Sequence, residues 1–187
     1  MALAADVGVG QVGRVGSRGG MSGGLASTEY STDGGATWAT GTQVLVAADP
    51  LGHLHDGANL VLYYSTDALG HTETTQTLTV NLDTVRPTTK APAAASVRRG
   101  KVATLKYRVG DVAPCAGTVT VTIKLRNRHN KVVATLHPGV KTADPLTTRR
   151  ASFRCKLAKG RYKFTVYAVD AAGNPQLRAA SRTLTVR

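Results

Sequence analysis

The sequence predicts an all-β protein made of two β-sandwich modules in tandem. Apolar residues recur at every second position in several short segments, most clearly from Val119 to Leu125. An aromatic, strand-like run followed by Asp-Ala-x-Gly occurs twice, around Asp67 and around Asp170, 103 residues apart. That spacing is the size of a domain and too long for a solenoid repeat. A length of 187 residues suits one or two domains.

The repeated Asp-Ala-x-Gly phrase is typical of a turn that ends a strand. An Asp carboxylate can accept hydrogen bonds from backbone N–H groups two residues on, and Gly adopts a positive φ without steric cost. Calcium binding is the alternative for the two Asp residues, but one carboxylate per turn is too few for a cation that takes six or more oxygens. We therefore expect structural turns at Asp67, Gly70, Asp170 and Gly173.

Residues 1–26 are rich in Gly and Ala and have no apolar periodicity. Such a segment buries too little surface to offset its ordering entropy, so we expect it to be disordered or poorly ordered. It also lacks the basic start and apolar core of a signal peptide. The favoured interpretation is that the chain is a fragment of a longer protein.

Residues 27–82 are expected to form the first module. Strand-like segments occur at 29–31, 44–46 and 60–64. The letters D-G-G between the first strand and Trp38 are a strong hairpin signal, with Asp33 and Gly35 as structural turn residues.

The first module resembles the Ig-like repeat of bacterial surface proteins, through Y-S-x-D-G-G-x-x-W at 30–38 and D-G, Y-S-x-D-x-x-G at 56–70. This resemblance implies a spacer or adhesive unit. The letters S-x-D-x-G-x-T-W at 31–38 also resemble the Asp box of sialidase-type propellers, where it is a structural hairpin. A propeller repeats this unit in several blades. The chain has one copy, which favours the plain hairpin and leaves a sialidase-type fragment as an alternative.

Residues 83–96 contain two Pro and several Thr and are expected to be an extended linker. Residues 97–187 are expected to form the second module, with strands near 102–109, 117–126, 131–137, 149–157, 160–169 and 179–186. This block resembles the C-terminal Ig-like or FlgD-like module of actinobacterial secreted proteins, through L-x-x-G-x-Y-x-F-x-V-Y-A-x-D-A-A-G-N at 157–174. The two resemblances imply tandem Ig-like or fibronectin-type β-sandwiches, which specify a fold and not an activity.

Both cysteines, Cys115 and Cys155, lie in the second module. An even pair in a module of secreted type predicts a disulfide. Closing that 40-residue loop would stabilise the fold by roughly 4 kcal/mol on the chain-entropy estimate. Two buried thiols are the alternative. No catalytic signature surrounds Cys115, so a Cys–His nucleophile is disfavoured.

Charge is divided unequally along the chain. Residues 1–90 carry four basic and eight acidic side chains, a net charge of −4, whereas residues 91–187 carry twenty and three, a net charge of +17. The second module should attract polyanions such as an anionic cell-wall polymer or polysaccharide, although solubility alone is the alternative. No nucleic-acid reading motif is present, so specific nucleic-acid recognition is not expected. The predicted polyanion contacts are Lys106, Arg108, Lys124, Arg126, Arg154 and Lys156.

The sequence offers no catalytic site, metal site or cofactor motif. No phosphate-cradling loop, dinucleotide fingerprint, G-x-S-x-G or H-E-x-x-H occurs. His53 and His55 could be joined by Asp49, Asp56 or His71 as metal ligands, but the segment is typical of a loop. No apolar stretch approaches the roughly eighteen residues of a membrane helix.

These observations predict a non-catalytic, extracellular or cell-surface spacer and adhesion protein. The alternative is an accessory module that binds an anionic or carbohydrate polymer. An exposed aromatic platform would favour this alternative, and Trp38, Tyr30 and Tyr167 are the candidates for it.

Overall fold

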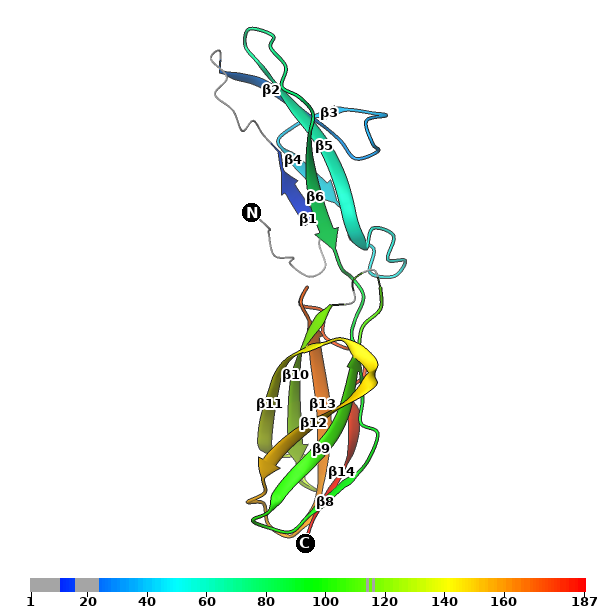
Figure 1. Ribbon diagram of the computed structural model, residues 1–187, viewed down its shortest axis with the longest axis vertical. Helices are drawn as coiled ribbons and strands as arrows, with labels where there is room; N and C mark the ends of the chain where they lie inside the picture. Colours follow the sequence, from blue (N-terminus) through cyan, green and yellow to red (C-terminus); the bar gives the residue numbers. More distant parts are fainter. Residues whose placement is uncertain (1–10, 16–23, 114, 116) are drawn as a thin grey trace. The chain divides into compact units, whose positions relative to one another are not determined.

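The computed structural model describes residues 11–15, 24–113, 115 and 117–187 (Figure 1). Every regular element among these residues is a β-strand, so the all-β prediction is confirmed. The chain divides into two compact units, Met1–Thr84 and Val85–Arg187. Each unit has its own apolar core.

The first unit contains six described strands in two sheets. They are β1 (Gln11–Arg14), β2 (Leu25–Ser31), β3 (Ala39–Thr40), β4 (Gln43–Val46), β5 (Gly57–Asp67) and β6 (Gln76–Leu82). The larger sheet has the order β3-β2-β5-β6, and β1 pairs with β4 in the second sheet. All of these pairs are antiparallel.

The core of the first unit is small and includes polar atoms. Burial alternates along β5, so that Val61 and Tyr63 point into the core, as the period of two predicts. Inside the same unit the hydroxyls of Thr28 and Ser65 lie 3.1 Å apart and are both buried. The hydrogen bond between them satisfies two polar groups that would otherwise be costly to bury.

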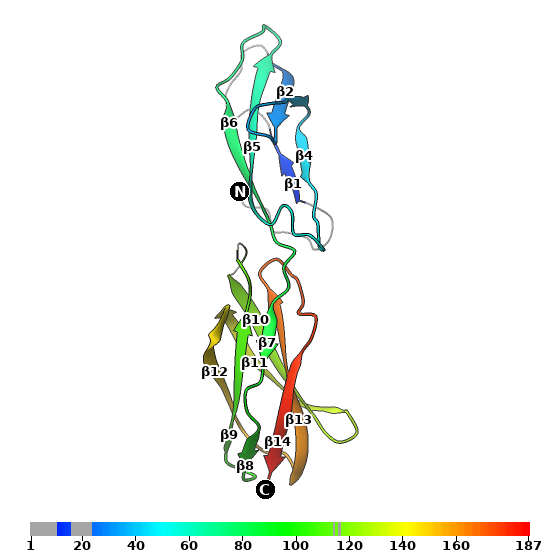
Figure 2. The ribbon, with the colours of Figure 1, turned by 90° about the vertical axis from the view of Figure 1, so that its right-hand side faces the viewer.

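The described residues of the second unit form eight strands in two sheets, which Figures 1 and 2 show from two sides. They are β7 (Thr88–Lys90), β8 (Ala95–Val97), β9 (Val102–Gly110), β10 (Thr118–Arg126), β11 (Val132–Thr142), β12 (Asp144–Arg154), β13 (Gly160–Asp170) and β14 (Ala180–Val186). One sheet has the order β11-β10-β13-β14-β8 and the other β12-β9-β7. Only the pair of β8 and β14 is parallel among the described strands.

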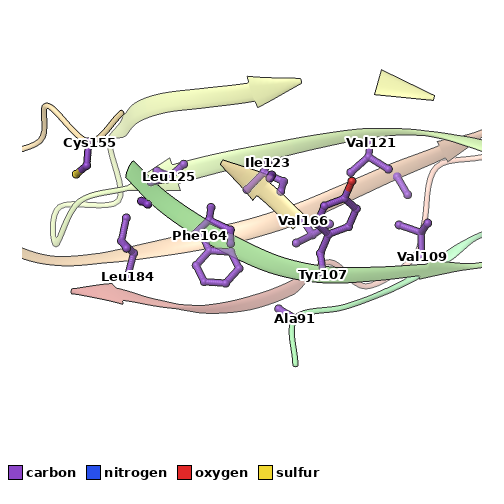
Figure 3. Packing of buried hydrophobic residues seen from close by; sticks show 14 of the residues in the cluster. Ala91, Tyr107, Val109, Val121, Ile123, Leu125, Cys155, Phe164, Val166 and Leu184 are labelled. Carbon is purple, nitrogen blue, oxygen red and sulfur yellow. The ribbon is translucent and has the colours of Figure 1, made fainter. Parts of the chain in front are cut away.

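The two sheets of the second unit enclose one apolar core between them (Figure 3). Tyr107 comes from β9, Ile123 and Leu125 from β10, and Phe164 and Val166 from β13; all five are fully buried. The alternation that predicted these strands therefore also identifies the face that each strand buries.

The two units repeat one strand order. The sheet β3-β2-β5-β6 of the first unit corresponds to β11-β10-β13-β14 of the second, and β4-β1 corresponds to β12-β9. The second unit adds β7 beside β9 and β8 beside β14. The repeated phrase in the sequence thus marks a repeated connectivity.

Strand positions in the second unit agree with the expected ones, except in β11 and β12. The strand expected at 149–157 begins five residues earlier, at Asp144, and ends at Arg154. The six predicted strands correspond to β9 to β14. However, β11 continues to Thr142 beyond His137, through a register shift opposite β10 between Val121 and Ile123. Gly139 has φ 78° at this point. The pair Pro138-Gly139 therefore forms an irregularity within a strand, where the sequence suggested that the strand ends.

Two expected segments differ from the structure. Residues 83–96 are not only a linker, because they contain β7 and the beginning of β8. The Thr89 hydroxyl donates to the Val166 carbonyl at 3.3 Å and accepts from the Ala180 N–H at 3.1 Å. Within 1–26, β1 and the beginning of β2 are ordered strands, and 1–10 and 16–23 lie outside the described residues. Short edge strands pair through backbone groups and need no apolar pattern.

Candidate functional site

A basic pocket lies at one end of the five-stranded sheet, where the β10–β11 turn meets the start of β13. It has a volume of about 370 Å³ and is lined by Arg126, Asn127, Arg128, Asn130, Arg161, Tyr162, Lys163 and Thr183. A second hollow of about 510 Å³ shares Asn127, Arg128, Arg161 and Tyr162, and adds His129, Lys159 and Gly160. We call Arg126, Arg128, Lys159, Arg161 and Lys163 the basic cluster.

The turn after β10 fixes one side of this pocket. The Asn127 side-chain oxygen accepts hydrogen bonds from the N–H groups of His129 and Lys131, both at 3.0 Å. Asn130 has φ 60°, a left-handed conformation that Asn tolerates better than most residues. Its carbonyl accepts a hydrogen bond from the Arg126 guanidinium at 2.9 Å, which holds that charge at the edge of the pocket.

Positive charges face each other across neighbouring strands of the second unit. Three directly opposite pairs are both cationic: Arg126 with Lys163, Lys106 with Arg150, and Lys90 with Arg108. Like charges in directly opposite positions destabilise a sheet. Among the described residues, the ion pairs present involve histidines of the first unit, and none involves Lys or Arg. In the described part of the chain, no acidic residue lines either hollow. A bound anion would relieve this repulsion.

The six predicted polyanion contacts are divided between two sheets. Lys106, Arg108 and Arg154 lie on β9 and β12, Lys124 and Arg126 lie on β10, and Lys156 follows β12. Only Arg126 belongs to the basic cluster. The Lys124 ammonium lies 5.3 Å from the centre of the Tyr167 ring, a cation–π contact within the protein.

Four members of the basic cluster were missed by sequence reasoning: Arg128, Lys159, Arg161 and Lys163. They lie in or beside two turns that are thirty residues apart in the chain. The antiparallel pairing of β10 with β13 brings those turns to the same end of the sheet. The turn letters N-R-H-N and K-G were visible in the sequence, but the pairing of the two strands was not.

The structure does not support the expected disulfide between Cys115 and Cys155, since no disulfide joins them in the described residues. The Cys155 N–H donates to the Lys101 carbonyl at 2.9 Å, beside the start of β9. Cys115 comes five residues after β9 ends at Gly110. Figure 3 shows Cys155 and Val109 at opposite ends of the core.

Strand length explains why the disulfide cannot form. A nine-residue strand such as β9 is about 27 Å long. Five residues of chain can return only about 17 Å. The Cα atoms of a disulfide lie within about 7 Å of each other. An even number of cysteines could not reveal that the two lie at opposite ends of one strand.

The Asp-box residues form a closed turn between β2 and β3. Asp33 accepts hydrogen bonds from the Ser31 hydroxyl at 2.7 Å and from the Thr37 N–H and hydroxyl at 3.0 and 2.6 Å. The hydrogen bonds from the Thr37 hydroxyl and the Ser31 hydroxyl hold the pKa of Asp33 well below its usual value. Gly35 has φ 98°. Both carboxylate oxygens of Asp33 are thus used to brace the turn.

The three candidate aromatic residues each have a partner within their own unit. Trp38 is 37% exposed, packs against Tyr64 with ring centres 4.8 Å apart at 57°, and donates its indole N–H to the Gly35 carbonyl. Tyr30 packs on the core of the first unit. Tyr167 lies under Lys124. The tilt of Trp38 against Tyr64 does not provide a flat stacking surface.

The histidine loop of the first unit is held by internal hydrogen bonds. His53 Nδ1 lies 2.6 Å from the Thr84 hydroxyl and 3.1 Å from Asp56 Oδ2. Asp49 accepts from the N–H groups of residues 51 and 52, and these hydrogen bonds lower its pKa. Among the described residues, His53, His55 and His71 take part in no group of three possible metal ligands.

The two Asp-Ala-x-Gly corners have the same backbone hydrogen bonds. In the first, the Asp67 N–H donates to the His71 carbonyl at 3.0 Å, and Asp67 Oδ1 accepts from the His71 N–H at 2.9 Å. In the second, the Asp170 N–H donates to the Asn174 carbonyl at 3.2 Å, and Asp170 Oδ1 accepts from the Asn174 N–H at 2.8 Å. Gly70 and Gly173 have φ 88° and 93°.

Comparison of the chain with protein-family models and with curated proteins gives no match. Within the described ranges, the structure contains no helix with the length and apolar character needed to cross a bilayer.

Proposed function

We propose that this chain is a non-catalytic, extracellular adhesion protein built from two Ig-like modules. The strand order supports this proposal for the second unit. In Ig lettering, β9 and β12 correspond to B and E, and β10, β13 and β14 to C, F and G, with β11 in the place of C′. The first unit repeats the order of C′, C, F and G.

The observation that carries the adhesive function is the basic cluster. Five cationic side chains line two hollows that share four residues, and no acidic residue in the described part of the chain lines either of them. By charge, the ligand class is an anionic polymer such as a cell-wall polymer or an acidic polysaccharide. The cationic pairs on the three-stranded sheet, including Lys106 with Arg150, extend the attraction beyond one site. A long polymer can contact both regions at once, whereas a small anion cannot.

Binding of this kind depends on salt. Exposed charges act over about 8 Å at physiological ionic strength and much less at high salt. Recognition of nucleic-acid bases is not part of the proposal. Single-stranded nucleic acid is usually bound by several aromatic rings on which the bases stack, and Tyr162 is the one aromatic residue that lines the pocket. Its hydroxyl donates a hydrogen bond to the Ala158 carbonyl at 2.9 Å.

The test measures binding of the whole chain to poly(glycerol phosphate), with neutral dextran as the comparison, at 50 and 300 mM salt. The double substitution R161Q/K163Q removes two charges from the basic cluster. K106Q/R150Q removes two charges from the other sheet, outside the basic cluster, and measures how much of the binding comes from long-range charge alone. We expect R161Q/K163Q to weaken binding about tenfold, which is about 1.4 kcal/mol, and the control to change it less than threefold.

Two outcomes would overturn the proposal. Equal losses in the two double variants would mean that net charge alone, and not the basic cluster, attracts the polymer. No binding by the unsubstituted chain at either salt concentration would leave the chain as a spacer.

A further inference from the structure

We propose that Asp111 and Asp170 of the second unit form a binding site for Ca²⁺. The first observation is the corner after β13. Asp170 is only 7% exposed. Its Oδ1 is used by the Asn174 N–H, but its Oδ2 is buried and has no hydrogen-bond partner among the described residues. A buried carboxylate oxygen without a partner is costly.

The corner after β5 provides an internal comparison. Asp67 is also buried, and its Oδ1 is used in the same way. Its Oδ2, however, lies 3.0 Å from the His71 ring nitrogen Nδ1. Asn174 takes the place of His71 in the second corner and leaves the matching oxygen of Asp170 unpaired. The same turn is therefore complete in one unit and lacks a partner in the other.

Asp111 supplies a second carboxylate at this place. It follows β9 directly, its Oδ1 accepts from the Val112 N–H at 3.0 Å, and its Oδ2 is buried without a partner. Carboxylate oxygens of Asp111 and Asp170 lie within 4.8 Å of each other. Burial raises the pKa of Asp111; the hydrogen bond from the Val112 N–H opposes this rise, and the charge of Asp170 adds to it. These residues are 59 positions apart, so the fold and not the local sequence brings them together.

A cation is the partner that satisfies both oxygens. Among the described residues neither carboxylate is within ion-pair distance of Lys or Arg, despite the basic character of the unit. Two hard oxygen ligands favour Ca²⁺ or Mg²⁺ over metals that prefer nitrogen or sulfur. Ca²⁺ binds oxygens at about 2.3–2.6 Å in flexible geometry and accepts carboxylates that come from two different strand ends, whereas Mg²⁺ requires about 2.1 Å and near-ideal octahedral geometry.

The ligand count sets the expected affinity. Ca²⁺ takes six to eight oxygens, and the two carboxylates leave the remaining positions to water and nearby carbonyl groups. Sites with few charged ligands bind Ca²⁺ at about 10⁻⁴ to 10⁻³ M, the range of extracellular modules. The basic side chains of the unit weaken this attraction only within the screening distance of about 8 Å.

The experiment titrates Ca²⁺ into the metal-free whole chain by calorimetry and records its melting curve at 0 and 5 mM Ca²⁺. We expect one equivalent to bind at submillimolar to millimolar concentration and to raise the melting temperature of the second unit. Asp111→Asn should weaken binding at least tenfold and abolish the rise. Asp67→Asn, the matched change in the other corner, should leave Ca²⁺ binding unchanged.

A second measurement keeps the proposal falsifiable if Asp170→Asn fails to fold. Without Ca²⁺, Asp111→Asn should melt above the unsubstituted chain, because it removes repulsion between two carboxylates; with 5 mM Ca²⁺ that advantage should disappear. If the Asn variant is the more stable by the same margin at both concentrations, Ca²⁺ does not bind between the two carboxylates, which would overturn the proposal. Equal Ca²⁺ binding by the Asp111→Asn variant would overturn it as well.

Discussion

The corners after β5 and after β13 have the same backbone and different surroundings for their carboxylates. Asp67 has His71 on its second oxygen, and Asp170 has none among the described residues. The turn itself needs only the first oxygen, since Oδ1 makes the capping bonds in both corners. The second oxygen is therefore free to acquire a different role in each unit.

The same lesson applies to the units as wholes. Residues 1–84 carry two basic and eight acidic side chains, whereas residues 85–187 carry twenty-two and three, yet the two units share one strand order. Strand order depends on the inward-facing alternation and the turns, and charge is placed on the outward faces. A single connectivity can thus support an acidic module and a basic one.

The largest expected effect separates the two cores. Phe164→Ala removes a fully buried ring from the second unit and should lower its stability by about 3–5 kcal/mol. Because each unit has its own core, we expect calorimetry to resolve two transitions, with only one of them shifted. Val132→Ala, at a position on β11 that is 38% exposed, is the control and should change little. A shift of both transitions would mean that the units unfold as one.

Acid should lower the stability of the first unit, by less than the loss expected from Phe164→Ala in the second. The His71 N–H lowers the pKa of Asp67, and the Thr37 hydroxyl lowers that of Asp33. Unfolding returns these groups to a pKa near 3.9, so the unfolded first unit binds more protons as the pH falls. Stability from these carboxylates is present above about pH 4 and is lost below it.

The measurement is the melting temperature of the first unit between pH 6 and pH 2.5. Asp67→Asn should be less stable at pH 6 and should lose less on acidification, because it no longer has that carboxylate to protonate. Asp144 of the second unit also has a lowered pKa, due first to the Thr147 hydroxyl, so that unit should lose some stability too. An Asp67→Asn variant with the same pH profile as the unsubstituted chain would contradict this account.

Local patterns were enough to predict most of the strands. Alternation at Val119 to Leu125 gave β10 and its buried face, and the two Asp-Ala-x-Gly phrases gave both corners. These features are formed by residues that are close together in the sequence, where strand propensity and the period of the apolar residues decide the local structure. The edge strands β7 and β8 were missed because three residues are too few to display a period.

Features formed by distant residues were not predictable. The basic cluster requires β13 to lie beside β10, and the closeness of Asp111 to Asp170 requires the end of β9 to meet the end of β13. Calcium was disfavoured from the sequence on the ground of one carboxylate per turn, and the second carboxylate comes from another strand. The even number of cysteines likewise does not show at which end of a strand each cysteine lies.

The smallest expected effect is that of reduction. The first unit has no cysteine and the second has two, so a disulfide would have stabilised one unit alone, by roughly 4 kcal/mol. Because Cys155 and Cys115 lie at opposite ends of β9, a strand about 27 Å long, we expect a reducing agent to leave both melting transitions where they are. Alkylation should add the same mass with and without prior reduction. Mass gained only after reduction, in the monomer, would contradict the placement of the two cysteines at opposite ends of β9. It would also imply that the basic unit depends on a covalent cross-link that the acidic unit folds without.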